Sequence, residues 1–220
     1  MKSLADLRPG DLMFANIGGI VPGVFPVKLG QLMLGERVRL GPLSIDHVGV
    51  VVEGAKSLYR EGSGWNHRRL VQAMPGGAEE IELNSQRHWT PQVAYARLPE
   101  DYPGQALDAA AIARAMIGTP YSFASYAALA AWRWGFRAEH LARWIDRRRP
   151  EQVADKPTGV ATAVALPAEA ICSVLADQAW TLAGKQVMPH GTRSQIVTPG
   201  ALALALWRTP GVTWGGAGLL

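Results

Sequence analysis

A single cysteine, Cys172, stands among five histidines in this chain of 220 residues. A thiol paired with an imidazole base is the covalent chemistry that these residue types suggest first. The pattern predicts a helix over residues 167–183, with Pro167 near its start and Gly184 at its end. Unpaired backbone N–H groups near such a helix start lower the pKa of a thiol and can hold an oxyanion. Cys172 is therefore a candidate nucleophile, with a small buried core residue as the alternative.

His47 is the candidate base among the five histidines. It lies at the beginning of a β-branched run, residues 46–52, that is typical of a buried strand. At a strand end the ring can reach a cleft while the following residues hold the backbone rigid. We expect the thiol sulfur and a ring nitrogen to lie roughly 3 to 4 Å apart. The other histidines lie in polar loops, a basic segment or a turn, where surface positions are expected: His67, His88, His140 and His190.

Gln72 is the candidate for a third polar group in the same site. It is the one polar residue in the apolar run 70–74, and an adjacent strand could place it beside His47. There it would hold the ring nitrogen that does not face the thiol. The alternative is an outward-facing strand residue without a role in the site.

The remaining pattern predicts one α+β domain, residues 1–220, in which helices pack against a small antiparallel sheet. Apolar and alternating runs predict the strands, and helical spacing predicts the helices. Further strands are expected within residues 7–14, 93–98 and 197–204, and further helices at residues 105–117, 122–134 and 138–148. We expect insertions at about residues 16–44 and 127–166.

The composition, 48% hydrophobic and 18% charged, indicates a globular protein with a net charge of +4. Six arginines fall within residues 133–149. They alternate with large apolar side chains: Trp132, Trp134, Leu141, Trp144 and Ile145. We expect residues 132–149 to form an amphipathic element beside the cleft that binds an anionic membrane or wall polymer. Packing of this segment on the domain is the alternative, and no nucleic-acid partner is expected.

With one cysteine, the chain can form neither an internal disulfide nor a four-cysteine zinc site, and no metal or cofactor is expected. The first residues carry an early acid and lack a continuous apolar run, so they do not resemble a signal peptide. No uncharged apolar stretch approaches the roughly 20 residues that span a bilayer. We expect a soluble protein, either cytoplasmic or delivered without a signal peptide, for example by a phage particle.

Several short motifs occur in a consistent order along the chain. One group is Gly118-Thr119-Pro120-Tyr121, Ile171-Cys172-Ser173 and Gly184-Lys185-Gln186-Val187-Met188-Pro189 with Ser194-Gln195. The other is Arg8-Pro9-Gly10-Asp11-Leu12, His47-Val48-Gly49-Val50-Val51 and Val71-Gln72-Ala73. The first group resembles the nucleophile half of the NlpC-type, papain-like cysteine peptidases, and the second resembles their base half. The base half comes first here, as in the circularly permuted, YiiX-like branch and the related lecithin retinol acyltransferase-like enzymes. Pro199-Gly200 falls where an unpermuted chain would enter its base half.

This resemblance implies a circularly permuted papain-like fold and a hydrolase that cleaves an amide bond, first of all in bacterial cell-wall peptide. It implies Cys172 as nucleophile, His47 as base and Gln72 as orienting residue, with Tyr121 and Ser173 contacting the substrate.

The chain also departs from the family pattern, because Ala170 and Ile171 stand where many members carry an aspartate that recognises a free amine. The departure favours an alternative, a hydrolase or acyltransferase acting on lipid-like acyl esters or amides. A non-catalytic structural module of the same fold is the third hypothesis.

Overall fold

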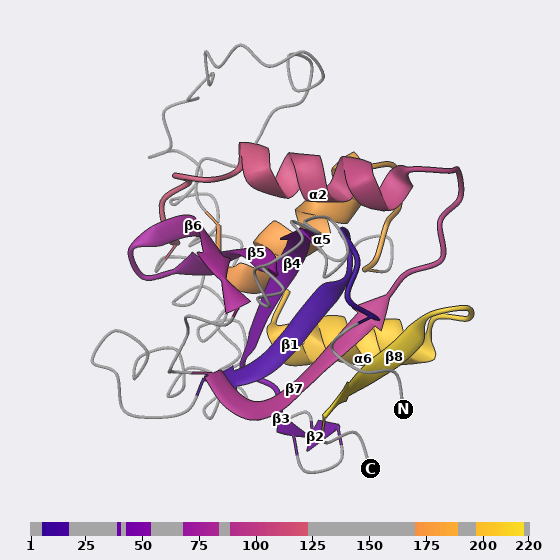
Figure 1. Ribbon diagram of the computed structural model, residues 1–220, viewed down its shortest axis with the longest axis horizontal. Helices are drawn as coiled ribbons and strands as arrows, with labels where there is room; N and C mark the ends of the chain where they lie inside the picture. The colour runs from indigo at the N-terminus through magenta and orange to yellow at the C-terminus, as the bar shows by residue number, and fades with distance from the viewer. Residues whose placement is uncertain are drawn as a thin grey trace, which may run out of the picture.

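The computed structural model describes residues 6–17, 39–40, 43–53, 68–83, 89–122, 170–188 and 197–217. These residues form an α+β structure with a six-stranded antiparallel sheet and three helices (Figure 1). The strands are β1 (Leu12–Ile17), β2 (Arg39–Leu40), β3 (Leu43–Ser44), β4 (His47–Glu53), β5 (Arg69–Met74), β6 (Gly77–Glu82), β7 (Trp89–Arg97) and β8 (Thr213–Ala217). The helices are α2 (Gln105–Ala115), α5 (Cys172–Leu182) and α6 (Pro199–Arg208). The expected α+β class is confirmed.

The main sheet has the strand order β6-β5-β4-β1-β7-β8, and every neighbouring pair is antiparallel. β2 and β3 form a separate two-stranded ladder. β5 and β6 form a hairpin in which Met74 opposes Gly77, so Pro75 and Gly76 make a two-residue turn. Gly77 has φ 113°, a left-handed conformation that glycine adopts without strain. The hairpin places β5 between β6 and β4, which carries His47.

The three helices pack on one face of the sheet and build the main core with it (Figure 1). Alternate strand residues point to this face, among them Phe14, Val48, Val50 and Val71. The intervening residues form a smaller cluster on the opposite face: Leu7, Met13, Val51, Leu70, Ile81 and Tyr95. The side chains of His47 and Gln72 project from the same face as this second set. Each residue directly adjoins one whose side chain faces the helices, Val48 or Val71.

The turn before β1 fixes the helices to the sheet. Gly10 has φ 86°, and a Cβ there would lie 2.7 Å from the Cβ of Ala106, so α2 packs directly against this backbone. The indole Nε1 of Trp180, in α5, donates to the carbonyl oxygen of Gly10 over 3.0 Å. The next residue, Asp11, is buried and accepts two hydrogen bonds from Arg97, at 2.7 and 2.8 Å. The Pro-Gly-Asp motif thus positions α5, the helix that begins with Cys172.

Two sequence predictions are corrected in this part of the chain. The helix expected from residue 167 begins at Cys172, because Ala170 forms a β-bridge with Tyr121 and Ile171 has extended backbone angles. The strand expected within residues 197–204 is instead helix α6. The Thr198 side chain accepts from the backbone N–H of Ala201, and Pro199 occupies the first helical turn, so these residues start a helix. Pro199-Gly200 is therefore not a turn that leads into a strand.

The other expected elements have different outcomes. The strands and the helix at residues 105–117 are present, with bounds that differ by at most five residues from those expected, as β1, β4, β5, β7 and α2. The helices expected at residues 122–134 and 138–148, the segment 132–149 and most of both expected insertions lie outside the described residues, so they stay predictions. Within the described ranges, no helix has both the length and the hydrophobicity needed to cross a membrane.

Candidate active site

His47 and Gln72 meet as predicted. The Nε2 atom of the His47 ring lies 2.8 Å from the Oε1 atom of Gln72, and both side chains are buried. An amide oxygen only accepts hydrogen bonds, so Nε2 must carry the proton of the neutral ring. Nδ1 is then the unprotonated nitrogen, which is the form that can accept a proton from a nucleophile. Gln72 therefore holds His47 in a tautomer suited to a general base.

The missing side chain of Gly49 allows the two strands to bring these residues together. Gly49 lies two residues after His47 and so faces the same side of the sheet. A Cβ at Gly49 would lie 2.6 Å from Cδ1 of Leu70, 3.1 Å from the carbonyl oxygen of Val71 and 3.7 Å from Cβ of Gln72. Because a Cβ in that position would press on β5, glycine lets β5 lie close enough for Gln72 to reach the ring.

Cys172 is the first residue of α5 and is 1% exposed. The backbone N–H groups of Val48 and Ser173 lie near its thiol, where they favour the thiolate. Val48 directly follows His47, and the paired register of β4 with β5 begins only at Val50. The start of β4 is therefore where the strand backbone lies beside the thiol. The His47 side chain alternates to the face of the sheet opposite the helices, so the expected separation of roughly 3 to 4 Å between sulfur and ring nitrogen stays a prediction. Ile171, the residue before the helix, offers no side-chain cap to the N–H groups of the first helical turn.

Burial sets the resting protonation states of the nucleophile and the base. It lowers the pKa of His47 to about 4, against a smaller upward effect of the Gln72 hydrogen bond. Burial also raises the pKa of the Cys172 thiol to about 12, although the backbone N–H groups of Val48 and Ser173 oppose this shift. The Asp46 carboxylate raises the thiol pKa further. Both groups are therefore neutral at pH 7. Entry of water or a polar substrate would reduce the desolvation and move the two pKa values toward each other.

Tyr121 and Ser173 lie close to the helix start. Tyr121 forms the bridge with Ala170, two residues before Cys172, and is 9% exposed. The Ser173 hydroxyl is fully buried and donates to the carbonyl oxygen of Val197, which ties α5 to the segment before α6. This bond gives Ser173 a structural role, and its contact with substrate stays a prediction.

Two residues of this region are not singled out by the sequence pattern. Glu79 accepts a hydrogen bond from the Gln72 amide, yet it lies in an acidic run, residues 79–82, that does not resemble a strand. The β6 partner strand was not predicted for the same reason. Asp177 is 5% exposed in the middle of α5. Helical spacing from a neighbouring apolar face was the one signal that could have indicated its burial.

For the hydrolase that the sequence motifs predict, we expect Gln72→Ala to lower turnover by about tenfold or more, because the ring loses the acceptor that fixes its tautomer. The measurement is the turnover rate on wall peptides or acyl esters. Gln105→Ala is the matched control, since Gln105 is also a buried glutamine and hydrogen-bonds to the Ala183 carbonyl in another part of the core. Equal losses in the two variants would show that Gln72 acts through stability alone.

Asp177 is expected to reduce stability at neutral pH. Its Oδ1 atom is buried with no hydrogen-bond partner among the described residues, and burial raises its pKa from 3.8 to about 6 despite the Met188 N–H. Because the folded-state pKa is raised, the unfolding free energy falls as the pH rises from about 4 to about 6. The shift corresponds to about 3 kcal/mol. Asp177→Asn should therefore raise the urea midpoint at pH 7, with a smaller gain near pH 4.5. The control, Asp108→Asn, removes an exposed carboxylate and should give no such gain.

A scan against protein-family models and a search of curated protein sequences both find no match for this chain. Within the part of the chain that the structure describes, no group of three or more His, Cys, Asp or Glu side chains could hold a metal ion. The chemistry of the site therefore has to be argued from its own residues.

Proposed function

We propose that this protein is a cysteine hydrolase with a circularly permuted, papain-like fold of the NlpC type. The observation that carries the proposal is the arrangement at the start of β4. The His47 ring is held at Nε2 by Gln72, and the backbone N–H of the next residue, Val48, lies near the Cys172 thiol. A thiol at the first residue of a helix and a histidine oriented by a third polar group are the components that covalent acyl transfer needs.

In the proposed mechanism, the Cys172 thiol gives its proton to Nδ1 of His47 while its sulfur bonds to the substrate carbonyl carbon. The resulting oxyanion is held by backbone N–H groups at the start of α5. The intermediate collapses as His47 returns the proton to the leaving amine, and the acyl group remains on sulfur as a thioester. A water molecule then gives a proton to His47 and attacks the thioester, which releases the acid and restores the thiol.

Bacterial cell-wall peptide is the proposed substrate, because the individual motifs resemble those of the wall-peptidase family, although in permuted order. The test is incubation of the protein with soluble wall peptides, followed by measurement of newly formed amino groups. Release of amines by the wild-type protein, and not by a Cys172→Ala variant, is the expected result. Wall peptides that stay intact while another amide or ester is cleaved would reject this substrate class and keep the cysteine hydrolase.

The second candidate is a hydrolase or acyltransferase for lipid-like acyl esters or amides. The specific observation that favours it lies immediately before the nucleophile, where Ala170 and Ile171 are apolar and at most 1% exposed. No carboxylate at these two positions can pair with a free amine. Release of fatty acid from lipid esters, without amine release from wall peptides, would decide for this candidate. A protein that reacts with neither substrate nor a thiol-directed activity probe would be a non-catalytic module.

A further inference from the structure

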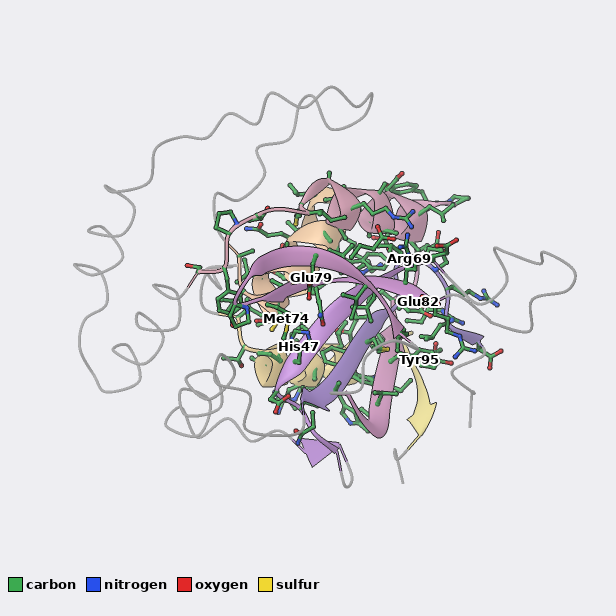
Figure 2. The ribbon with its side chains drawn as sticks, turned by 60° about the vertical axis from the view of Figure 1, so that its left-hand side comes forward. His47, Arg69, Met74, Glu79, Glu82 and Tyr95 are labelled. Atoms are coloured by element: carbon green, nitrogen blue, oxygen red, sulfur yellow. The ribbon has the colours of Figure 1, made fainter. Side chains whose placement is uncertain are left out.

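Three polar side chains form a continuous hydrogen-bonded chain from the interior to the surface of the β4–β5–β6 sheet region. The His47 ring bonds to Oε1 of Gln72 over 2.8 Å, and Nε2 of Gln72 donates to Oε1 of Glu79 over 3.0 Å. Gln72 and Glu79 are direct partners in the β5–β6 register, so the hairpin itself places them together. Figure 2 shows Glu79 and Met74 near His47, and Arg69 and Glu82 farther along the ribbon.

The amide group of Gln72 has two possible orientations with opposite consequences for the base. With its oxygen toward the ring, it accepts from Nε2–H and leaves Nδ1 unprotonated. With its NH₂ group toward the ring, it would donate to Nε2 and place the proton on Nδ1, which could then not accept the thiol proton. The two orientations have nearly the same shape, so the ring alone does not select between them. A neighbour that can only accept, or only donate, decides the orientation.

Glu79 is such a neighbour, because an ionised carboxylate accepts hydrogen bonds and cannot donate them. It therefore attracts the NH₂ group of Gln72 and turns the amide oxygen toward His47. The other two acidic residues of β6 do not share this contact. Glu80 bonds to Arg114 of α2 on the helix side of the sheet, and Glu82 alternates to the same side as Glu80.

We propose that Glu79 is a positioning residue, which acts through Gln72 to set the tautomer of His47. This inference rests on the proposed function for its catalytic consequence, but the tautomer itself is a property of the folded protein. When His47 becomes an imidazolium, neutral Gln72 cannot balance its charge. Glu79, which is hydrogen-bonded to Gln72, provides a negative charge for this purpose. Glu79 is exposed, so water screens this charge, and the orientation of the amide is the larger effect.

The decisive variant is Glu79→Lys, since an ammonium group only donates hydrogen bonds. It should attract the Gln72 oxygen, reverse the amide and move the His47 proton from Nε2 to Nδ1. Glu79→Asp keeps a carboxylate, which only accepts hydrogen bonds, and should preserve the wild-type tautomer. Glu82→Lys is the matched control, with the same charge change on the same strand but the opposite face.

The tautomer is measured by ¹⁵N NMR of histidine-labelled protein, with a His47→Gln sample to assign the signals. We expect Nε2–H in the wild-type protein, in Glu79→Asp and in Glu82→Lys, and Nδ1–H in Glu79→Lys. Thermal unfolding and circular dichroism verify that each variant is folded. If Glu79→Lys does not fold, Glu79→Ala replaces it, and loss of a single Nε2–H tautomer is then the expected result. An unchanged tautomer in the folded variant overturns the inference.

Hydrolysis separates this inference from the proposed function. Glu79→Lys should lose turnover by about tenfold or more, whereas Glu79→Asp, which keeps the carboxylate, should retain most of it. If the tautomer switches between the wild-type protein and Glu79→Lys, but the wild-type protein hydrolyses nothing, the proposed function is disproved and the positioning role of Glu79 stands. A wild-type protein that hydrolyses its substrate, with Glu79→Lys equally active, would disprove the role of Glu79 and leave the function intact.

Discussion

Replacing Cys172 with alanine is expected to abolish hydrolysis, with a loss of at least about a thousandfold in turnover. The thiol is the atom that forms the covalent intermediate, and an alanine methyl group can neither bond to the carbonyl carbon nor supply a proton. The change should have a small effect on folding, because it removes one buried sulfur from the start of α5. Turnover on wall peptides or acyl esters is the measurement, together with the midpoint of thermal unfolding.

The chain provides a direct control for this result, because Cys172 is its only cysteine. A thiol-directed reagent can therefore label one position alone, and the fraction of labelled protein should match the fraction of activity lost. Full activity in Cys172→Ala, or in fully labelled wild-type protein, would mean that another group performs the chemistry.

Replacing His47 with alanine is expected to lower turnover by about a hundredfold or more, which is the usual contribution of a general base. The pH profile of the wild-type protein tests the same assignment. Because burial lowers the pKa of His47 to about 4, the ring stays able to accept a proton at pH 5.5. Activity in the wild-type protein should therefore persist at pH 5.5 and fall only as the pH approaches 4. An acid limb near pH 6.5, with an NMR titration of His47 at the same pH, would show that the ring is solvated.

The same pKa shift has a consequence for stability. The unfolded protein protonates His47 near pH 6.5, whereas the folded protein resists protonation down to about pH 4. The unfolding free energy should therefore fall as the pH drops from about 6.5 to 4, by about 3 kcal/mol. His47→Gln removes this dependence. Between about pH 4 and 6, Asp177 has the opposite effect on the unfolding free energy, because its raised pKa favours the folded state at lower pH. The two effects oppose each other in the wild-type protein and are separated by the single variants.

The strand residues of the site could be predicted because each strand has a local pattern. The β-branched run after His47 and the apolar run around Gln72 both indicate buried strands, and a pair of adjacent strands is the simplest way to bring the two residues together. The hydrogen bond between His47 and Gln72 confirms that inference.

Other features of the fold depend on contacts that the sequence pattern does not reveal. β6 carries three glutamates, and it is a strand because β5 pairs with it across a two-residue turn. The Leu-Ala alternation of residues 201–206 imitates a strand, but the cap at Thr198 and the spacing of the buried Leu202 and Leu206 make it a helix. The helix predicted from Pro167 starts later because Ala170 pairs with Tyr121, a residue far away in the sequence. The role of Glu79 follows from the hairpin register, which depends on the same tertiary pairing.

The central claim, that Cys172 carries the acyl group during hydrolysis, is tested most directly by the intact mass of protein quenched with acid during turnover. The wild-type protein should gain the mass of the acyl part of its substrate, and peptide mapping should locate this mass on Cys172. The gain should be absent from Cys172→Ala. Product formation by the wild-type protein with no acyl group on Cys172, or equal product formation by Cys172→Ala, would show that Cys172 is not the nucleophile.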